Sequence, residues 1–220
     1  MEKRKVIFGT YDTAQTGAWT VAGLELTSPD IQTNLVAIPG RDGPLDLSTV
    51  LTDGEPVYNS RKLTVVLENS DGDRAAREAL IRTIIAQLDG YQKQIWLPDD
   101  ADHYLQGRLH VVRNYNDMAH AAVTVTATCD PWLYSNTEKV YTLTASSTEK
   151  TATLDNNGRK AVVPVVEATD RATIVYGTTT WTLAVGTQQL PDFVLLAGSH
   201  TVKYSGSGTI KITYREAVLL

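Results

Sequence analysis

Apolar and polar residues alternate over short segments through most of the first 136 residues. These segments are rich in Val, Ile, Thr and Tyr, and a period of two is typical of strands with one buried face. The alternation is clearest in five segments: 19–26 (WTVAGLEL), 62–68 (KLTVVLE), 94–98 (QIWLP), 107–112 (GRLHVV) and 121–128 (AAVTVTAT). The pattern predicts half-buried antiparallel strands.

One segment of this region has a helical period instead. From Asp73 to Leu88 the apolar side chains recur every three or four residues, on the stripe formed by Leu80, Ile81, Ile84, Ile85 and Leu88. Asp71 or Asp73 can cap the start of a helix, and Gly90 can end it. We expect one amphipathic helix, over about residues 73–89, that covers one face of the sheet.

A second region begins after residue 136. Residues 137–220 show no helical period, and turn signals such as 156–158 (NNG) and 205–208 (SGSG) separate many short strand candidates. Those candidates are KVYTLT, KTATL, AVVPVVEA, TIVYG, WTLAV, DFVLLA, HTVKYS and TIKITYRE. We therefore predict two domains, residues 1–136 and 137–220, of which the second is a small all-β sandwich.

Composition narrows the function classes. The 42% of hydrophobic residues suffice for a buried core, and neither a run of eighteen apolar residues nor a signal-peptide pattern is present, so we expect no membrane insertion. The lone Cys129 has no partner for an internal disulfide, which favours folding in a reducing compartment. The net charge is −5 and charges of both signs are interspersed, which argues against sequence-specific nucleic-acid binding.

The densest group of chemically active side chains lies in the stretch PDDADHY, residues 98–104. It contains Asp99, Asp100, Asp102 and His103, which could bind a hard cation or act as a base. The spacing matches neither an EF-hand nor a HExxH pair. We interpret the stretch as a polar turn in which Asp side chains bind their own backbone.

The remaining candidates for catalysis are isolated. Cys129 lies in an alternating run, where a small buried hydrophobe is the simplest interpretation. The histidines are scattered along the chain and no GxSxG-like motif accompanies them: His103, His110, His120 and His200. We therefore expect no catalytic residue, no cofactor and no metal site, and interpret the chain as a non-enzyme.

Aromatic residues of the second domain allow two interpretations. Tyr176, Trp181, Tyr204 and Tyr214 could form a platform on which a sugar ring stacks. The same residues also fit core packing or cross-strand pairs of a β-sandwich. Exposure of the rings distinguishes the two.

The tract AIPGRDGPLDLSTVL, residues 37–51, interrupts the alternation. Gly40 and Gly43 flank Arg41 and Asp42, yet the spacing of a phosphate-binding loop is absent. We interpret the tract as a turn-rich extension leading to an exposed strand, Leu45–Val50, whose free edge a neighbouring chain can complete.

Several motifs occur in an order that resembles a known family. IPGRDGPLDLS is followed by Tyr58 and Arg61 before a strand, then by a helix ending in LDG, by IWLPDDADHYLQGRL and by CDPWLYS. Together they resemble the amino-terminal domain of the distal tail proteins of siphophages, over about residues 1–136. The final stretch FVLLAGSHTVKYSGSGTIKITYRE is similar to the small, galectin-like carboxy-terminal β domain of the shorter members.

This resemblance implies an architecture and a role. It implies an amino-terminal β-sandwich with one helix, assembled into a homo-hexameric ring that joins the tail tube to the tip or baseplate around a channel for DNA. The implied partners are the tail tube protein, a tip or tail-associated protein and receptor-binding proteins, and the implied location is the virion tail tip, after assembly in the host cytoplasm. Residues of the extension become candidates for the subunit interface: Pro39, Gly40, Arg41, Asp42, Gly43, Leu45 and Leu47.

Two other functions remain open at this point. A carbohydrate-binding adhesion module would use the aromatic residues of the second domain, which has no room for the large sugar-binding insertions of some family members. A hydrolase would need His and carboxylate side chains to converge in a cleft.

Overall fold

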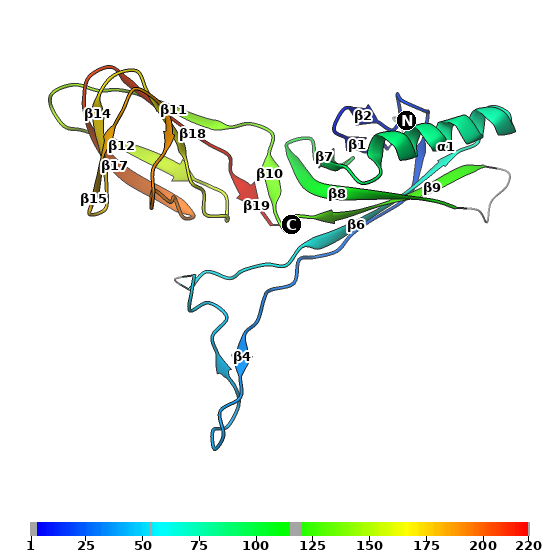
Figure 1. Ribbon diagram of the computed structural model, residues 1–220, viewed down its shortest axis with the longest axis horizontal. Coiled ribbons are helices and arrows are strands. Elements are labelled where there is room, and N and C mark those ends of the chain that lie inside the picture. The colour runs from blue at the N-terminus through cyan, green and yellow to red at the C-terminus, as the bar shows by residue number, and fades with distance from the viewer. Residues whose placement is uncertain (1–3, 53, 115–119, 220) are drawn as a thin grey trace. The chain divides into compact units, whose positions relative to one another are not determined.

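The computed structural model describes residues 4–52, 54–114 and 120–219, and the chain divides into two compact units. Unit 1 is Met1–Leu133 and unit 2 is Tyr134–Leu220. The fold is mainly β, as predicted, with one α-helix among the described residues (Figure 1).

Unit 1 is built on one antiparallel sheet with the strand order β2-β1-β7-β8-β9-β6-β3. The five segments with alternating residues all form strands of this sheet, which confirms the prediction. The bounds are β1 (Ile7–Phe8), β2 (Tyr11–Asp12), β3 (Thr20–Leu26), β6 (Arg61–Asn69), β7 (Gln92–Trp96), β8 (His103–Arg113) and β9 (Ala121–Cys129). Alternate residues of β6, β8 and β9 are buried, because one face of the sheet carries the core.

Helix α1 (Arg74–Leu88) covers that face (Figure 1). The Asp73 side chain caps its first turn, accepting a hydrogen bond of 2.8 Å from the Ala76 amide. Of the expected stripe, Ile81, Ile84 and Leu88 are buried and the other two members are partly exposed. The strands that carry the core of unit 1 lie in this one sheet, so α1 and not a second sheet forms the other layer of the core.

The end of the core of unit 1 contains a buried guanidinium. In the paired strands Arg61 lies opposite Cys129, which in turn lies opposite Gly107. A Cβ atom on Gly107 would be 2.6 Å from the Cys129 sulfur, so only glycine leaves room for the thiol. Arg61 Nε and Nη2 are buried without a hydrogen-bond partner among the described residues. Burial raises the pKa of the Cys129 thiol to about 11, against a smaller opposing effect of the Arg61 charge.

Unit 2 is a β-sandwich of two four-stranded sheets, ordered β11-β18-β13-β16 and β12-β17-β14-β15. Apolar residues from both sheets form its core, with Val166, Ile174, Val202 and Ile212 fully buried. The bounds are β11 (Lys139–Thr144), β12 (Lys150–Asn156), β13 (Val165–Ala168), β14 (Ala172–Tyr176), β15 (Thr179–Leu183), β16 (Gly186–Gln189), β17 (Gly198–Gly206) and β18 (Thr209–Tyr214). A short strand pair, β10 (Leu133–Ser135) with β19 (Ala217–Val218), completes the assignment.

Two details of unit 2 differ from the sequence prediction. The apolar stretch DFVLLA forms only an isolated bridge, Leu195 with Val162, because Asp192 adopts a positive φ of 62° and turns the chain. Its alternate residues Phe193 and Leu195 still point into the core. The polar segment GTQQ forms edge strand β16 although it lacks the alternation that would predict a strand.

No helix in the described part of the chain is long and apolar enough to cross a membrane.

Ile84→Asp should unfold unit 1, because it places an unpaired carboxylate at a fully buried site, at a cost of about 4 kcal/mol or more. Chemical denaturation of the full chain, followed by the fluorescence of buried Trp19, measures the loss. Thr83→Asp is the matched control, because the neighbouring side chain is exposed. Equal stability of the two variants would show that Ile84 does not support the core.

Cys129 should make the stability of unit 1 fall at alkaline pH. Because its pKa is raised on folding from 9.0 to about 11, its contribution is complete below pH 9 and is lost as the pH rises toward 11. Over that interval the wild type should lose about 2 to 3 kcal/mol more than Cys129→Ala, at 1.36 kcal/mol for each pKa unit. Denaturation curves at a series of pH values test this, and parallel pH profiles would contradict it.

Candidate subunit interface

A long hairpin, the arm (residues 27–60), extends from the paired strands β3 and β6 of unit 1 (Figure 1). Its root is held by backbone hydrogen bonds on both sides. Thr27 N donates to Lys62 O at 2.9 Å, and Lys62 N donates to the Thr27 hydroxyl at 2.9 Å. The pairing of the sheet therefore continues directly into the arm.

Beyond the root, the two sides of the arm stay paired through sparse contacts. Asn59 N donates to Asp30 O and Gln32 N to Val57 O, each at 2.8 Å. Further out, strand β4 (Leu35–Val36) pairs with β5 (Leu45–Asp46). Leu47 N also donates to Asn34 O at 2.8 Å. A ladder this short and without a second layer is marginally stable by itself.

The expected exposed strand Leu45–Val50 is shorter than predicted and ends at Asp46. The Asp46 carboxylate accepts a hydrogen bond from Ser48 N at 2.9 Å, and hydrogen bonds from Ser48 lower the pKa of this carboxyl. The chain then turns, with Val50 N donating to Leu47 O and Gly54 N to Thr49 O. The local Asx turn thus outcompetes the strand that the alternation in LDLSTV suggested.

The arm contains all seven residues expected at the interface. Pro39, Gly40, Arg41, Asp42 and Gly43 form its exposed tip, while Leu45 and Leu47 are partly buried on the returning side. Gly40 and Gly43 have positive φ values of 82° and 75°, with no atom near the position of a Cβ. Glycine is needed here by the sharp turn and not by a close contact.

Exposed apolar side chains along the arm were not predicted from the sequence. Ile31 and Leu35 are 53% and 55% exposed, Val50 is 62% exposed and Leu51 is 98% exposed. Val36 and Ile38 are exposed as well. Apolar residues grouped on a hairpin without a core mark a surface that binds another protein. These residues lie between turn-forming residues without a regular period, and the sequence alone does not show whether such residues are buried in a core.

An aromatic pair lies near the root of the arm. Tyr58 and Trp132 meet edge to face, with ring centroids 5.5 Å apart. Arg61, three residues after Tyr58, is the buried guanidinium that begins β6. The root is thus packed against the core of unit 1, whereas the tip has no contact of this kind.

The Asp-rich stretch 98–104 forms the expected turn. Asp100 Oδ1 accepts hydrogen bonds from the backbone amides of Asp102 and His103, both at 3.1 Å. His103 Nδ1 lies 3.0 Å from the same oxygen, while Asp99 is paired with Arg4 at 3.5 Å. Within the described ranges no three His, Cys, Asp or Glu side chains are grouped to hold a metal ion.

The four aromatic residues considered for a sugar platform pack largely into the sandwich of unit 2. Tyr204 and Tyr214 are 8% and 5% exposed, so their rings have no free face for a sugar. Tyr176 and Trp181 are partly buried and contact Phe193, with centroids 5.5 Å and 5.6 Å away. The Tyr176 hydroxyl bonds His200 Nδ1 at 2.8 Å, and burial raises the pKa of this tyrosine. These contacts are those of core packing.

Comparison with known proteins finds a likeness in fold alone. No protein-family model and no curated protein matches the chain. Among solved structures, the Dit protein of phage SPP1 matches with a TM-score of 0.70 at 16% sequence identity, over 97% of this chain and 99% of that one. That protein is described as a paradigm of the hub adsorption apparatus in phages that infect Gram-positive bacteria.

A second match, in the baseplate of phage p2, has a TM-score of 0.48 at 8% identity. The SPP1 match spans both units, including the part of the chain from which the arm extends. Over nearly its whole length, this chain has the fold of a siphophage Dit protein.

Proposed function

We propose that this protein is a structural hub of a phage tail tip. In this role six copies form a ring through unit 1, and the ring joins the tail tube to the tip or baseplate around a channel for DNA. Its neighbours in the particle are the tail tube protein, a tip or tail-associated protein and receptor-binding proteins. The ring assembles in the host cytoplasm and stays in the virion, and the protein is not an enzyme.

The observation that carries the proposal is the arm with its exposed apolar side chains. Leu35 and Leu51, at 55% and 98% exposure, are unfavourable in a chain that stays alone in water. A second copy that covers them removes this cost. The likeness in fold to SPP1 Dit supports the same interpretation, since that protein is a hub component.

The arm also fits a ring better than a two-fold dimer. An arm that binds a different surface of the next copy makes a head-to-tail contact, and such contacts repeat until the rotation closes a ring. Pairing in which two arms bind each other would bury both at once and stop at two copies. A hairpin rooted at one edge of the sheet, at β3, is suited to the head-to-tail arrangement.

Chemical groups that could have supported catalysis are engaged in structural contacts. Cys129 is 1% exposed, with its pKa raised by burial, so its thiol is a poor nucleophile at neutral pH. His200 bonds Tyr176 through Nδ1 and the Leu196 carbonyl through Nε2, at 2.8 Å each. Both groups therefore support a structural role.

Native mass spectrometry of the full chain at rising concentration tests the ring. We expect a particle of six copies of the 24.0 kDa chain. In a variant with a shortened arm, Asn-Gly replaces residues 35–46, since Asn34 O already accepts from Leu47 N as in a two-residue hairpin turn. This variant should keep the circular dichroism of the wild type and stay monomeric.

Two results would contradict the proposal. A wild-type chain that remains monomeric at every accessible concentration would show that the protein does not form a ring by itself. A shortened-arm variant that forms the same six-copy particle would show that the ring does not depend on the arm.

A further inference from the structure

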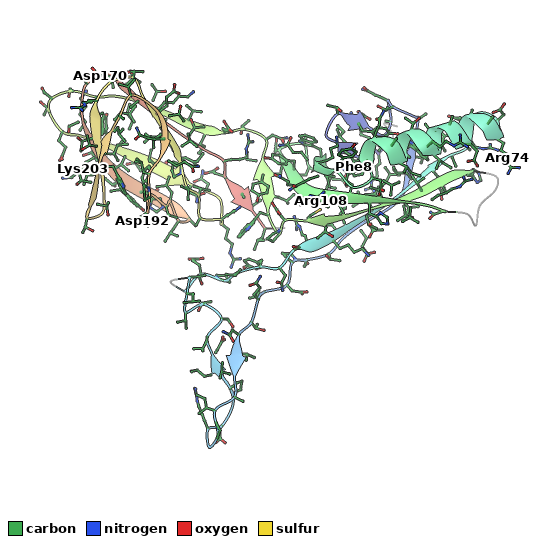
Figure 2. The ribbon with its side chains drawn as sticks, viewed as in Figure 1. Phe8, Arg74, Arg108, Asp170, Asp192 and Lys203 are labelled. Atoms are coloured by element: carbon green, nitrogen blue, oxygen red, sulfur yellow. The ribbon has the colours of Figure 1, made fainter. Side chains whose placement is uncertain are left out.

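The outward side of α1 bears an excess of positive charge. Arg74, Glu78 and Arg82 follow one another at intervals of four residues, so they share one side of the helix. Arg74 and Arg82 are exposed, and Figure 2 shows Arg74 on the first turn of α1. Arg77 lies on the same turns and donates to the Gly72 carbonyl at 3.2 Å.

The single carboxylate of this surface is already paired. Glu78 accepts two hydrogen bonds from Arg113, which ends strand β8, and the one from Nη1 is 2.7 Å long. This pairing, with smaller contributions from the charges of Arg82 and Arg74, lowers the pKa of Glu78. Glu78 thus stays ionised but neutralises only one guanidinium. Among the described residues, neither Arg74 nor Arg82 forms a hydrogen bond or a close ion pair.

Between these arginines the surface is hollowed. A shallow cavity of about 470 Å³ is lined by Arg74, Ala75, Glu78, Ala79 and Arg82, and we call it the α1 groove. Ala75 and Ala79 supply apolar lining, and Arg74, Glu78 and Arg82 lie beside them on the neighbouring stripe of the helix. Such a groove fits an extended segment that combines apolar side chains with carboxylates.

The arm has that composition. Residues 27–60 contain five acidic side chains and a single basic one, Arg41. Asp42 is exposed at the tip and Glu55 is exposed on the returning side, and the exposed Val50 and Leu51 lie between them in the sequence. The charge of the arm is therefore opposite in sign to that of the α1 groove, and both surfaces carry apolar area.

The arm is also long enough to reach a neighbour. From Thr27 to its tip near Arg41 it has about 14 residues, which span at most roughly 45 Å when extended. A compact domain of 100 residues has a radius of gyration of only about 13 Å. An arm rooted at one edge of unit 1 can thus cross a large part of the next copy.

The uncovered face of the sheet, another polar surface of unit 1, suits the arm less well. It carries Lys62, Arg108 and His110 together with Glu25 and Glu68, all exposed. The carboxylates of this face would lie beside those of the arm. The α1 groove lacks such a conflict, because Arg113 holds its one carboxylate.

We propose that the arm of one copy docks in the α1 groove of the adjacent copy, with carboxylates of the arm paired to Arg74 and Arg82. This inference rests on the proposed ring and names the surface that receives the arm. In this head-to-tail contact the charge pairs fix the register of the arm, and the alanine side chains of the groove contact its apolar residues.

Two double variants test the contact. The arm variant is Asp42→Lys with Glu55→Lys. Asp46 is left unchanged, so that its carboxylate still accepts the hydrogen bond from Ser48 N. The groove variant is Arg74→Glu with Arg82→Glu. Each should raise the concentration at which the six-copy particle forms by about a hundredfold or more, because like charges then meet at the contact. Lys203→Glu with Lys211→Glu in unit 2 changes the net charge by the same amount as the groove variant and should leave assembly unchanged.

Mixing the two double variants gives the decisive result. In an alternating ring, each Lys-bearing arm faces a Glu-bearing groove, and each wild-type arm faces a wild-type groove. Two proteins that do not assemble alone should therefore form a six-copy particle when mixed in equal amounts, with three copies of each. Native mass spectrometry resolves this composition when one variant is isotope-labelled.

The outcomes separate this inference from the proposed ring. If the wild type forms rings and both double variants form rings equally well, the ring stands and the docking in the α1 groove is overturned. The docking is also overturned if the mixture stays unassembled, or if the unit 2 control loses assembly to the same degree. If the groove variant still forms the ring but no longer binds a DNA duplex that the wild type binds, the arginines bind nucleic acid and the proposed docking is wrong.

Discussion

The backbone pairing of β3 with β6 is the contact on which the arm depends. Strand β6 is fixed from its other side by β9, and its alternate side chains are buried in the core. Because β3 has a partner on only one side, its position relies on this ladder alone. Both strands then leave the sheet as the two sides of the arm, so a rigid root in the core directs a hairpin that has no core. A change that loosens the ladder would alter the direction of the arm without touching the arm itself.

The elements of unit 1 could be predicted because their periods are clear. Strands such as β6 and β9 alternate over most of their length, and Ile81, Ile84 and Leu88 recur at helical spacing. The arm could be located from its glycines and prolines, but the exposure of Leu35 and Leu51 could not. Apolar residues without a regular period look alike in a sequence whether they are buried in a core or exposed for binding to another chain. Only the fold distinguishes the two. Strand β16 was missed for the opposite reason, since its backbone pairs with β13 while its side chains are polar.

Charge was the property that composition described least well. Along the chain, acidic and basic residues alternate closely enough to suggest an even surface with a net charge of −5. In the folded protein the charges are separated. Carboxylates are concentrated on the arm, and guanidinium groups lie around Glu78, on α1 and at the end of β8. The sorting follows from periodicity, because residues four apart on a helix share a side whatever lies between them. A mean over the sequence cannot show such a division.

The sparse ladder of the arm has a consequence for how assembly ends. A hairpin held by so few hydrogen bonds keeps much of its conformational freedom until it lies against another surface, and each docking event must overcome that entropy. In an open chain of copies one arm and one receiving surface remain unused, whereas the copy that closes the proposed ring gives an arm and receives one in the same step. Its second contact is intramolecular, so the effective concentration is high and this contact forms without the further loss of translational freedom that each earlier addition requires. A loosely formed arm would thus make incomplete rings short-lived and completed rings persistent.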